Sequence, residues 1–245
     1  MKNLNVFCFG FGQVAKNFIY KINSEKYNIN LSVTSTSKTS KKNFDGVNYQ
    51  NFLFNSEEYD KNLLIKLKEA DHILVSIPPI KGEDIVIKEF SKFIEMSKVK
   101  WITYLSATSV YGDHEGRWVD EKSETKPTSQ NGIARLAAEN DWLSLTINKN
   151  NHYFSRIHVE DIANILFESL LKFKSGEIYN ISDDKPSSSE EITSYGAKIL
   201  NIKNIKKIEA YEIQNEMLKN FYKDSKKVSN KKIKSFFSYD LKFPT

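Results

Sequence analysis

Cysteine, proline and glycine are scarce in this chain, which has one, five and nine of them among 245 residues. The single cysteine, Cys8, excludes an internal disulfide and a cysteine metal cluster, and its apolar neighbours predict a buried strand. No apolar run approaches the roughly 18 residues that cross a bilayer, and the first residues lack the long apolar stretch of a signal peptide. We therefore expect a folded cytoplasmic protein with no metal site.

Arginine is also rare, with three among the 36 basic residues, so lysine carries most of the formal net charge of +5. The lysines are spread along the chain and mixed with 31 acidic residues, as on a solvated surface. The densest basic stretch, 223–234, lacks the aromatic interleaving of a single-strand binder and the spacing of a zinc finger. We expect no nucleic-acid partner, and strongly salt-dependent binding of DNA or RNA would contradict this expectation.

Short apolar runs alternate with helical patterns over the first hundred residues, which is typical of a parallel sheet with helices on both faces. Strands are expected at 4–9, 31–36, 47–52, 72–77, 101–105 and 177–181. Helices are expected at 13–23, 62–69, 84–96, 132–145 and 160–173, with one more after the serines 187–189. The sequence therefore predicts an α/β fold built on a doubly wound parallel sheet.

The first expected strand is followed directly by a glycine-rich turn of the form G-x-G-x-x-A that opens a helix. Gly10 permits the tight turn, Gly12 lets the backbone approach a pyrophosphate, and Ala15 allows close packing of helix on strand. Gln13 and Val14 begin the helix, whose N-terminus supplies amide donors. This context favours a dinucleotide-binding site over a plain tight turn.

The Rossmann-type fold that this site implies divides the chain into two parts. Residues 1–160 form the expected dinucleotide-binding domain. Residues 161–245 are expected to complete the fold and to form a small C-terminal substrate lobe.

The second expected strand ends without the carboxylate that would bind the free 2′-hydroxyl of an NAD ribose. It is followed instead by Thr36, Ser37 and Lys38, and hydroxyls with a lysine suit a 2′-phosphate. NADP is therefore favoured over NAD, with the alternative that Lys38 is a solvated loop lysine. Ser76 and Pro78, after the fourth strand, are further expected cofactor contacts.

Two later stretches share a pattern with a known family. They are Tyr-Leu-Ser-Ala-Thr-Ser-Val-Tyr-Gly-Asp at 104–113 and Arg-Ile-His-Val-Glu-Asp-Ile-Ala at 156–163, supported by 76–79, 116–121, 176–183 and 227–233. In these motifs the chain resembles the NAD-dependent epimerase/dehydratase family, which consists of extended or atypical short-chain dehydrogenases. The resemblance covers nearly the whole chain and implies a nicotinamide cofactor and a small-molecule substrate, with nucleotide sugars as one class.

Members of that family usually work through Ser or Thr, Tyr and Lys. The resemblance places these positions at Ala107, Asn131 and Arg135, so all three depart from the pattern. An amide exchanges no proton near neutral pH, and a guanidinium stays protonated, although Arg135 can still bond ribose or phosphate. The usual proton relay is therefore missing.

Candidate replacements lie in and after the fifth strand. Ser106 is next to Ala107 and is also an expected cofactor contact. Tyr111 and Asp113 lie in the loop that follows the fifth strand, which we expect beside the cofactor. Tyr111 is the preferred acid, with the alternative that it packs within the Val-Tyr-Gly turn. These residues, with Arg135, are the expected catalytic set.

Two functions of different classes remain open. The first is an NADP(H)-binding oxidoreductase of the epimerase/dehydratase type with a degenerate triad. The second is a non-catalytic sensor or scaffold that binds NAD(P). Neither function requires a membrane, and either is compatible with a homodimer. Arg117 and Arg156 are candidates to face an anionic substrate, and Asp161 is expected to cap the helix that follows it.

The segment before the second family motif is short. Only residues 146–155 separate the helix at 132–145 from that motif, where the resembled family has a sixth strand and a substrate loop. We therefore expect either a chain break near Leu145 and Thr146 or a sheet that lacks this strand.

Overall fold

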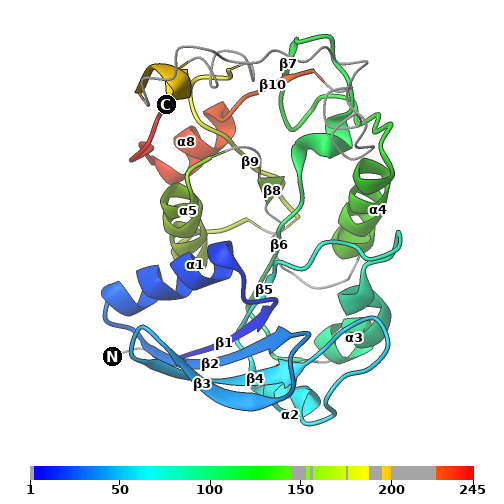
Figure 1. The fold of residues 1–245 in the computed structure, drawn as a ribbon, viewed down its shortest axis with the longest axis vertical. Helices are drawn as coiled ribbons and strands as arrows, with labels where there is room; N and C mark the ends of the chain where they lie inside the picture. Colours follow the sequence, from blue (N-terminus) through cyan, green and yellow to red (C-terminus); the bar gives the residue numbers. More distant parts are fainter. Residues whose placement is uncertain are drawn as a thin grey trace.

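The computed structural model describes residues 3–95, 97–144, 153–154, 157–174, 176–187, 195–199 and 225–245. Its centre is a six-stranded sheet of order β3-β4-β2-β1-β5-β6, parallel throughout except for β3 (Figure 1). The strands are β1 (Asn3–Phe9), β2 (Asn28–Ser35), β3 (Ser40–Phe44), β4 (Val47–Leu53), β5 (His72–Val75) and β6 (Trp101–Tyr104). The carboxyl ends of the five parallel strands therefore meet at one edge of the sheet.

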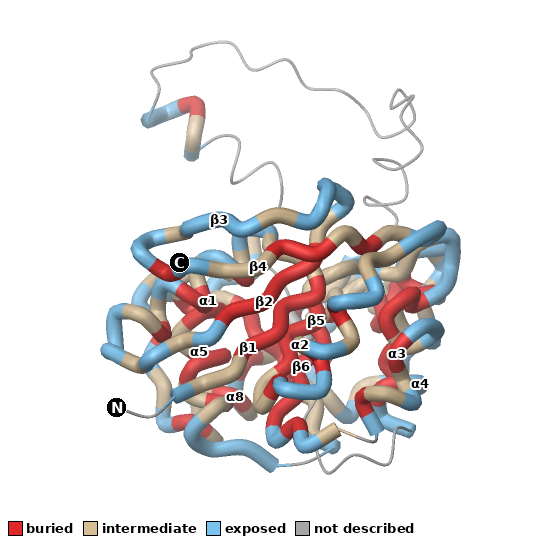
Figure 2. Tube along the Cα trace, turned by 90° about the horizontal axis from the view of Figure 1, so that it is seen from below, coloured by how far each residue is buried: buried red, intermediate tan, exposed pale blue. Residues whose placement is uncertain are grey.

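Helices cover both faces of this sheet, which confirms the doubly wound fold. The helices are α1 (Gln13–Ser24), α2 (Leu63–Glu69), α3 (Ile85–Glu95), α4 (Gln130–Ser144), α5 (Val159–Leu171) and α8 (Lys231–Phe237). Alternate side chains of β1 point to opposite faces, so Val6 and Cys8 pack with α1, α5 and α8, while Phe7 and Phe9 pack with α2, α3 and α4. Both apolar layers are buried in Figure 2.

The edge strand β3 was not predicted from the sequence, because its residues are polar and charged rather than apolar. It forms a hairpin with β4 through Asp45 and Gly46, whose φ angles of 51° and 78° suit a two-residue hairpin turn. Lys41 and Lys42 are exposed along this strand. Charged side chains of this kind keep an edge strand from pairing with another chain.

Several predicted boundaries shift by a few residues. The fourth expected strand stops at Val75 instead of residue 77, since two prolines follow that cannot donate to a ladder. The strand expected at 177–181 is reduced to β9 (Asn180–Ile181). Asp84 precedes α3 and accepts hydrogen bonds from the amides of Val86 and Ile87 and from the indole of Trp142. These bonds start α3 and fix α4 beside it.

The C-terminal residues are tied to α5 by a buried carboxylate. Asp161 is fully buried and accepts hydrogen bonds from the Tyr239 hydroxyl at 2.8 Å and from the amides of Lys242 at 2.7 Å and Phe243 at 3.0 Å. The expectation that Asp161 caps its own helix was wrong, because the His158 imidazole accepts the Glu160 amide there instead. Residues after 225 thus complete the cover of the sheet.

No strand pairs with the outer side of β6 among the residues that the structure describes. The short strand β8 (Tyr153–Phe154) pairs with β9 and not with the main sheet. Residues 145–152, where a chain break was expected, lie outside the described part, as do Arg156 and the start of the helix expected after 187–189.

Replacing Asp161 by alanine is expected to lower the free energy of unfolding by about 3 kcal/mol, because two backbone amides and a hydroxyl lose a buried acceptor. Urea denaturation followed by circular dichroism measures this change. Glu160→Ala on the same helix is the matched control, since the Glu160 carboxylate is exposed and pairs with Lys242. Equal effects of the two changes would contradict the anchoring role of Asp161.

Candidate active site

The glycine-rich turn lies at the carboxyl end of β1 and opens α1. Gly10 has a φ of 86°, and a Cβ there would come within 2.8 Å of the Ser76 hydroxyl, so this position requires glycine. Gly12 is the N-cap of α1, and a Cβ at this position would meet no atom within 4 Å. The first turn of α1 has no side-chain cap and no acidic residue. Its amides therefore remain available to an anion.

Side chains from the two neighbouring strands hold this turn in place. The Gly10 amide donates to the Thr34 hydroxyl of β2 at 3.0 Å. On the other side, the Ser76 hydroxyl lies 3.1 Å from the Phe9 carbonyl and 3.2 Å from that of Gly10. Ser76 was predicted as a cofactor contact, and the structure brings it against the glycine turn. Thr34 was missed, because a threonine within a strand gives no pattern of its own.

An aromatic contact fixes the outer part of the same turn. The Phe11 ring lies 5.6 Å from the ring of Phe44 on β3 and 5.0 Å from that of Tyr49 on β4, measured between centroids. The β3–β4 hairpin, which was not predicted from the sequence, therefore supports the predicted glycine turn.

The residues expected around a 2′-phosphate lie just after β2. Thr36, Ser37 and Lys38 are all exposed, and the Ser37 amide donates to the Ser35 hydroxyl at 3.2 Å. The Lys38 carbonyl accepts from the Asn51 amide group at 3.3 Å, which fixes the backbone while its ammonium group extends into solvent. The nearby Thr39 hydroxyl bonds to Asp60, whose pKa is lowered mainly by that bond.

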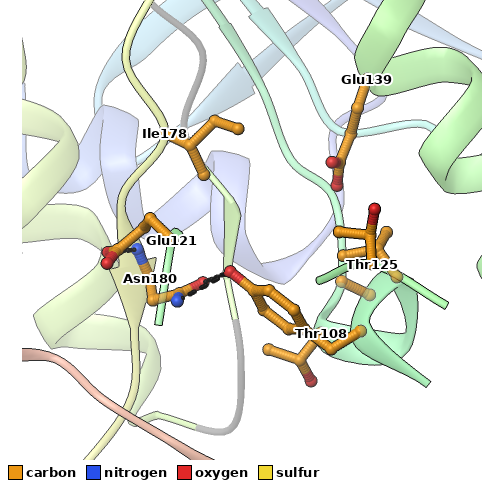
Figure 3. A pocket seen from close by; sticks show the side chains of 9 residues that line it. Thr108, Glu121, Thr125, Glu139, Ile178 and Asn180 are labelled. Carbon is orange, nitrogen blue, oxygen red and sulfur yellow. Dashed lines mark hydrogen bonds between the residues drawn. The ribbon is translucent and has the colours of Figure 1, made fainter. Parts of the chain in front are cut away.

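A second site lies at the end of β6, which pairs with β5 and so lies two strands from the glycine turn. Here a small pocket of about 30 Å³, partly open to solvent, lies between α4 and the loop after β6. Figure 3 shows Glu139 of α4 directed into it, with Thr125 beside it and Glu121, Ile178 and Asn180 on the opposite wall. The pocket therefore presents two carboxyl groups among hydroxyl, amide and apolar side chains.

Glu139 is the most perturbed carboxyl group of the pocket. Burial raises its pKa to about 7, against the opposing effects of a hydrogen bond from Ser106 and the positive charge of Arg135. The Ser106 hydroxyl donates to Glu139 Oε1 at 2.6 Å. Ser106 was among the predicted catalytic residues, whereas Glu139 was not. Its position four residues after Arg135, on the buried face of the same helix, is the signal that marks it.

The predicted acid Tyr111 is buried, and its hydroxyl exchanges hydrogen bonds with the Asn180 side chain at 2.9 and 3.1 Å, marked by the dashed line in Figure 3. Burial raises the pKa of this phenol, against the opposing effect of its hydrogen bond with Asn180. The arrangement favours the alternative in which Tyr111 packs. Glu121, on the opposite wall of the pocket, accepts a hydrogen bond from the backbone amide of Asn180 at 2.6 Å. Asn180 is therefore bonded to both Tyr111 and Glu121.

Asp113 and the arginines also have defined positions. Asp113 accepts hydrogen bonds from the amides of Glu115 and Ser225, which lower the pKa of its carboxyl group. The Arg135 guanidinium donates to the Leu105 carbonyl at 3.1 Å and supports the end of β6. Arg117 is exposed and pairs with Glu115 at 3.5 Å. Asp113 is therefore ionised at neutral pH, and its carboxylate fixes the loop instead of carrying a proton.

The described residues contain neither a cluster of metal-binding side chains nor a membrane-spanning helix. Within them, no three histidine, cysteine, aspartate or glutamate side chains gather closely enough to hold a metal ion. Likewise, none of the helices in that part of the chain has the length and apolar character needed to cross a membrane.

Comparisons with known proteins agree on the fold. No protein-family profile and no curated protein sequence matches the chain. A functionally unknown conserved protein from Silicibacter pomeroyi is 26% identical with a TM-score of 0.85, over 100% of this chain and 95% of that one. The UDP-glucuronic acid 4-epimerase from Bacillus cereus, solved in complex with NAD, is 14% identical with a TM-score of 0.75, over 99% and 94%.

A third similar structure is the Bordetella bronchiseptica enzyme WbmG in complex with NAD and UDP. It is 13% identical with a TM-score of 0.74, and the match covers 100% of this chain and 92% of that chain. The chain thus has the Rossmann-type fold found in NAD-binding epimerases of nucleotide sugars.

Proposed function

We propose that this protein is a nicotinamide-dependent oxidoreductase of the epimerase/dehydratase type, which acts on a nucleotide sugar or a related small molecule. The observation that carries the proposal is the open glycine turn at the uncapped N-terminus of α1, held by Thr34 and Ser76. Backbone amides and the helix dipole at such a turn favour a pyrophosphate. The small pocket beside Glu139, two strands away, is where a reacting group would contact the protein.

The proposal includes a preference for NADP(H). Gly10, Gly12, Gln13 and Val14 would hold the pyrophosphate. Ser76, Pro78 and Ser106 would line the path toward the nicotinamide. Thr36, Ser37 and Lys38 would surround the 2′-phosphate, because they are exposed beside β2 and Lys38 offers a cation. A phosphate at this place needs a cation, whereas a free ribose hydroxyl needs a carboxylate that the turn lacks.

Calorimetric titration is expected to show tighter binding of NADP⁺ than of NAD⁺, and Lys38→Glu is expected to reverse that order. Loss of one charge-assisted contact weakens NADP⁺ binding by about 10- to 100-fold. Lys68→Glu is the matched control, since Lys68 is an exposed lysine at the end of α2, away from the turn after β2. Equal affinities of the wild-type protein for the two cofactors would contradict the proposed preference.

A non-catalytic sensor or scaffold is the second candidate. It is favoured by one specific observation, namely that Ala107, Asn131 and Arg135 occupy the three positions of the usual triad and that Arg135 bonds to the Leu105 carbonyl. The two candidates differ in whether a substrate binds beside the cofactor. A sensor needs only the dinucleotide, whereas an oxidoreductase also needs the pocket.

Thermal unfolding distinguishes these candidates. A ligand that binds only the folded state, at 100 times its Kd, adds about 2.7 kcal/mol and raises the Tm by about 5 to 10 °C. NADPH is expected to raise the Tm for either candidate. A further rise with UDP-glucose or UDP-glucuronic acid added to the NADPH-loaded protein supports the oxidoreductase. No further rise with either nucleotide sugar favours the sensor.

A further inference from the structure

Glu139 is a nearly buried acid that lines a pocket at the end of the central sheet. Its side chain is 4% exposed, yet it lines the pocket at the end of β6 (Figure 3). Ser106, 8% exposed, donates to Oε1 at 2.6 Å. Within the described part of the chain, Glu139 Oε2 accepts no hydrogen bond. This oxygen can therefore exchange a proton with a group in the pocket.

The groups around Glu139 decide its protonation. Arg135, one turn earlier on α4, is the cation that acts on it, but the guanidinium is directed to the Leu105 carbonyl. Tyr104 of β6 and Tyr111 are phenols whose pKa values are raised by burial, so both are neutral. Glu121, across the pocket, is a second, half-buried carboxyl group whose pKa is raised by burial. The surroundings therefore allow Glu139 to gain or lose a proton near neutral pH.

We propose that Glu139, oriented by Ser106, is the acid–base group of this pocket and replaces the missing tyrosine. This inference rests on the proposed function. In reduction, a bound reduced nicotinamide would supply a hydride to a carbonyl carbon of the substrate, and the C=O π electrons would move to oxygen. That oxygen takes the proton from Glu139 Oε2, which leaves a carboxylate that Ser106 stabilises and that solvent reprotonates. The products are the alcohol and the oxidised cofactor.

The direction of pH dependence follows from this role. A proton donor acts only while it is protonated, so reduction slows as pH rises through the pKa of Glu139, near 7. Oxidation of an alcohol needs the carboxylate, so it speeds up over the same range. Removing the Ser106 hydroxyl removes a bond that lowers this pKa, and the midpoint then moves upward.

The first test needs neither cofactor nor substrate. Infrared difference spectra of protein with ¹³C-labelled glutamate side chains, taken between pH 5.5 and 8.5, are expected to show one carboxyl group that titrates near pH 7. Its band is lost in Glu139→Gln, moves to higher pH in Ser106→Ala, and stays in the control Asp141→Asn, which changes an exposed carboxylate on the same helix. Ionisation of Glu139 throughout this range would overturn the inference.

The second test measures a single turnover. NADPH-loaded protein is mixed with a UDP-linked 4-ketohexose, and the loss of NADPH absorbance is followed at several pH values. Glu139→Gln keeps the size of the side chain and a hydrogen-bond acceptor for Ser106, and it is expected to slow reduction by about 10²- to 10⁴-fold while the Kd of NADPH stays the same. Asp141→Asn is expected to react at the wild-type rate.

Failures of the two proposals look different. A protein that binds neither NADPH nor NADH contradicts the proposed function. If the protein binds NADPH but does not reduce the ketone, the oxidoreductase proposal is contradicted in favour of the sensor. If the wild-type protein reduces the ketone and Glu139→Gln reduces it equally well, the acid–base role of Glu139 is wrong.

Discussion

The hydrogen bonds that hold Gly10 between β2 and β5 are the constraint on which the site depends. Thr34 accepts the Gly10 amide on one side, and Ser76 contacts the Phe9 and Gly10 carbonyls on the other. They fix the glycine turn at the carboxyl edge of the sheet, and with it the direction in which α1 leaves β1. An anion can use the α1 amides only if this turn keeps its shape.

Apolar packing of α5 and α8 on α1 and a few buried polar groups join the second half of the chain to this frame, and none of its described strands pairs with the six-stranded sheet. Asp161 holds the C-terminal residues against α5, which packs on α1 in the same apolar cluster. Tyr111 and Glu121 both bond to Asn180 and so join the loop after β6 to the segment around β9. The pocket lies between these parts, so its shape depends on bonds that link distant segments of the sequence.

The fold could be predicted from the sequence because it rests on local patterns. Apolar runs gave the parallel strands, and the spacing of Gly10, Gly12 and Ala15 gave the turn and the start of α1. β3 was not predicted because its residues are polar and charged, although the Asp45-Gly46 pair that joins it to β4 is a hairpin signal in the sequence. Glu139 was missed as a site residue because only tertiary packing buries it beside Ser106. The roles of Tyr111 and Asp113 likewise depend on partners far away in the sequence, Asn180 and Ser225.

Binding of a dinucleotide at the N-terminus of α1 is tested most directly by Gly12→Asp. Gly12 has an extended backbone and open space around it, so aspartate fits there and caps the helix. Its carboxylate would then occupy the amides that a pyrophosphate needs and would repel the phosphates. Calorimetry is expected to show NADPH binding weakened by more than about 100-fold, which corresponds to about 2.8 kcal/mol, with the free energy of unfolding unchanged or slightly raised. Wild-type affinity for NADPH in this stable variant would contradict the account.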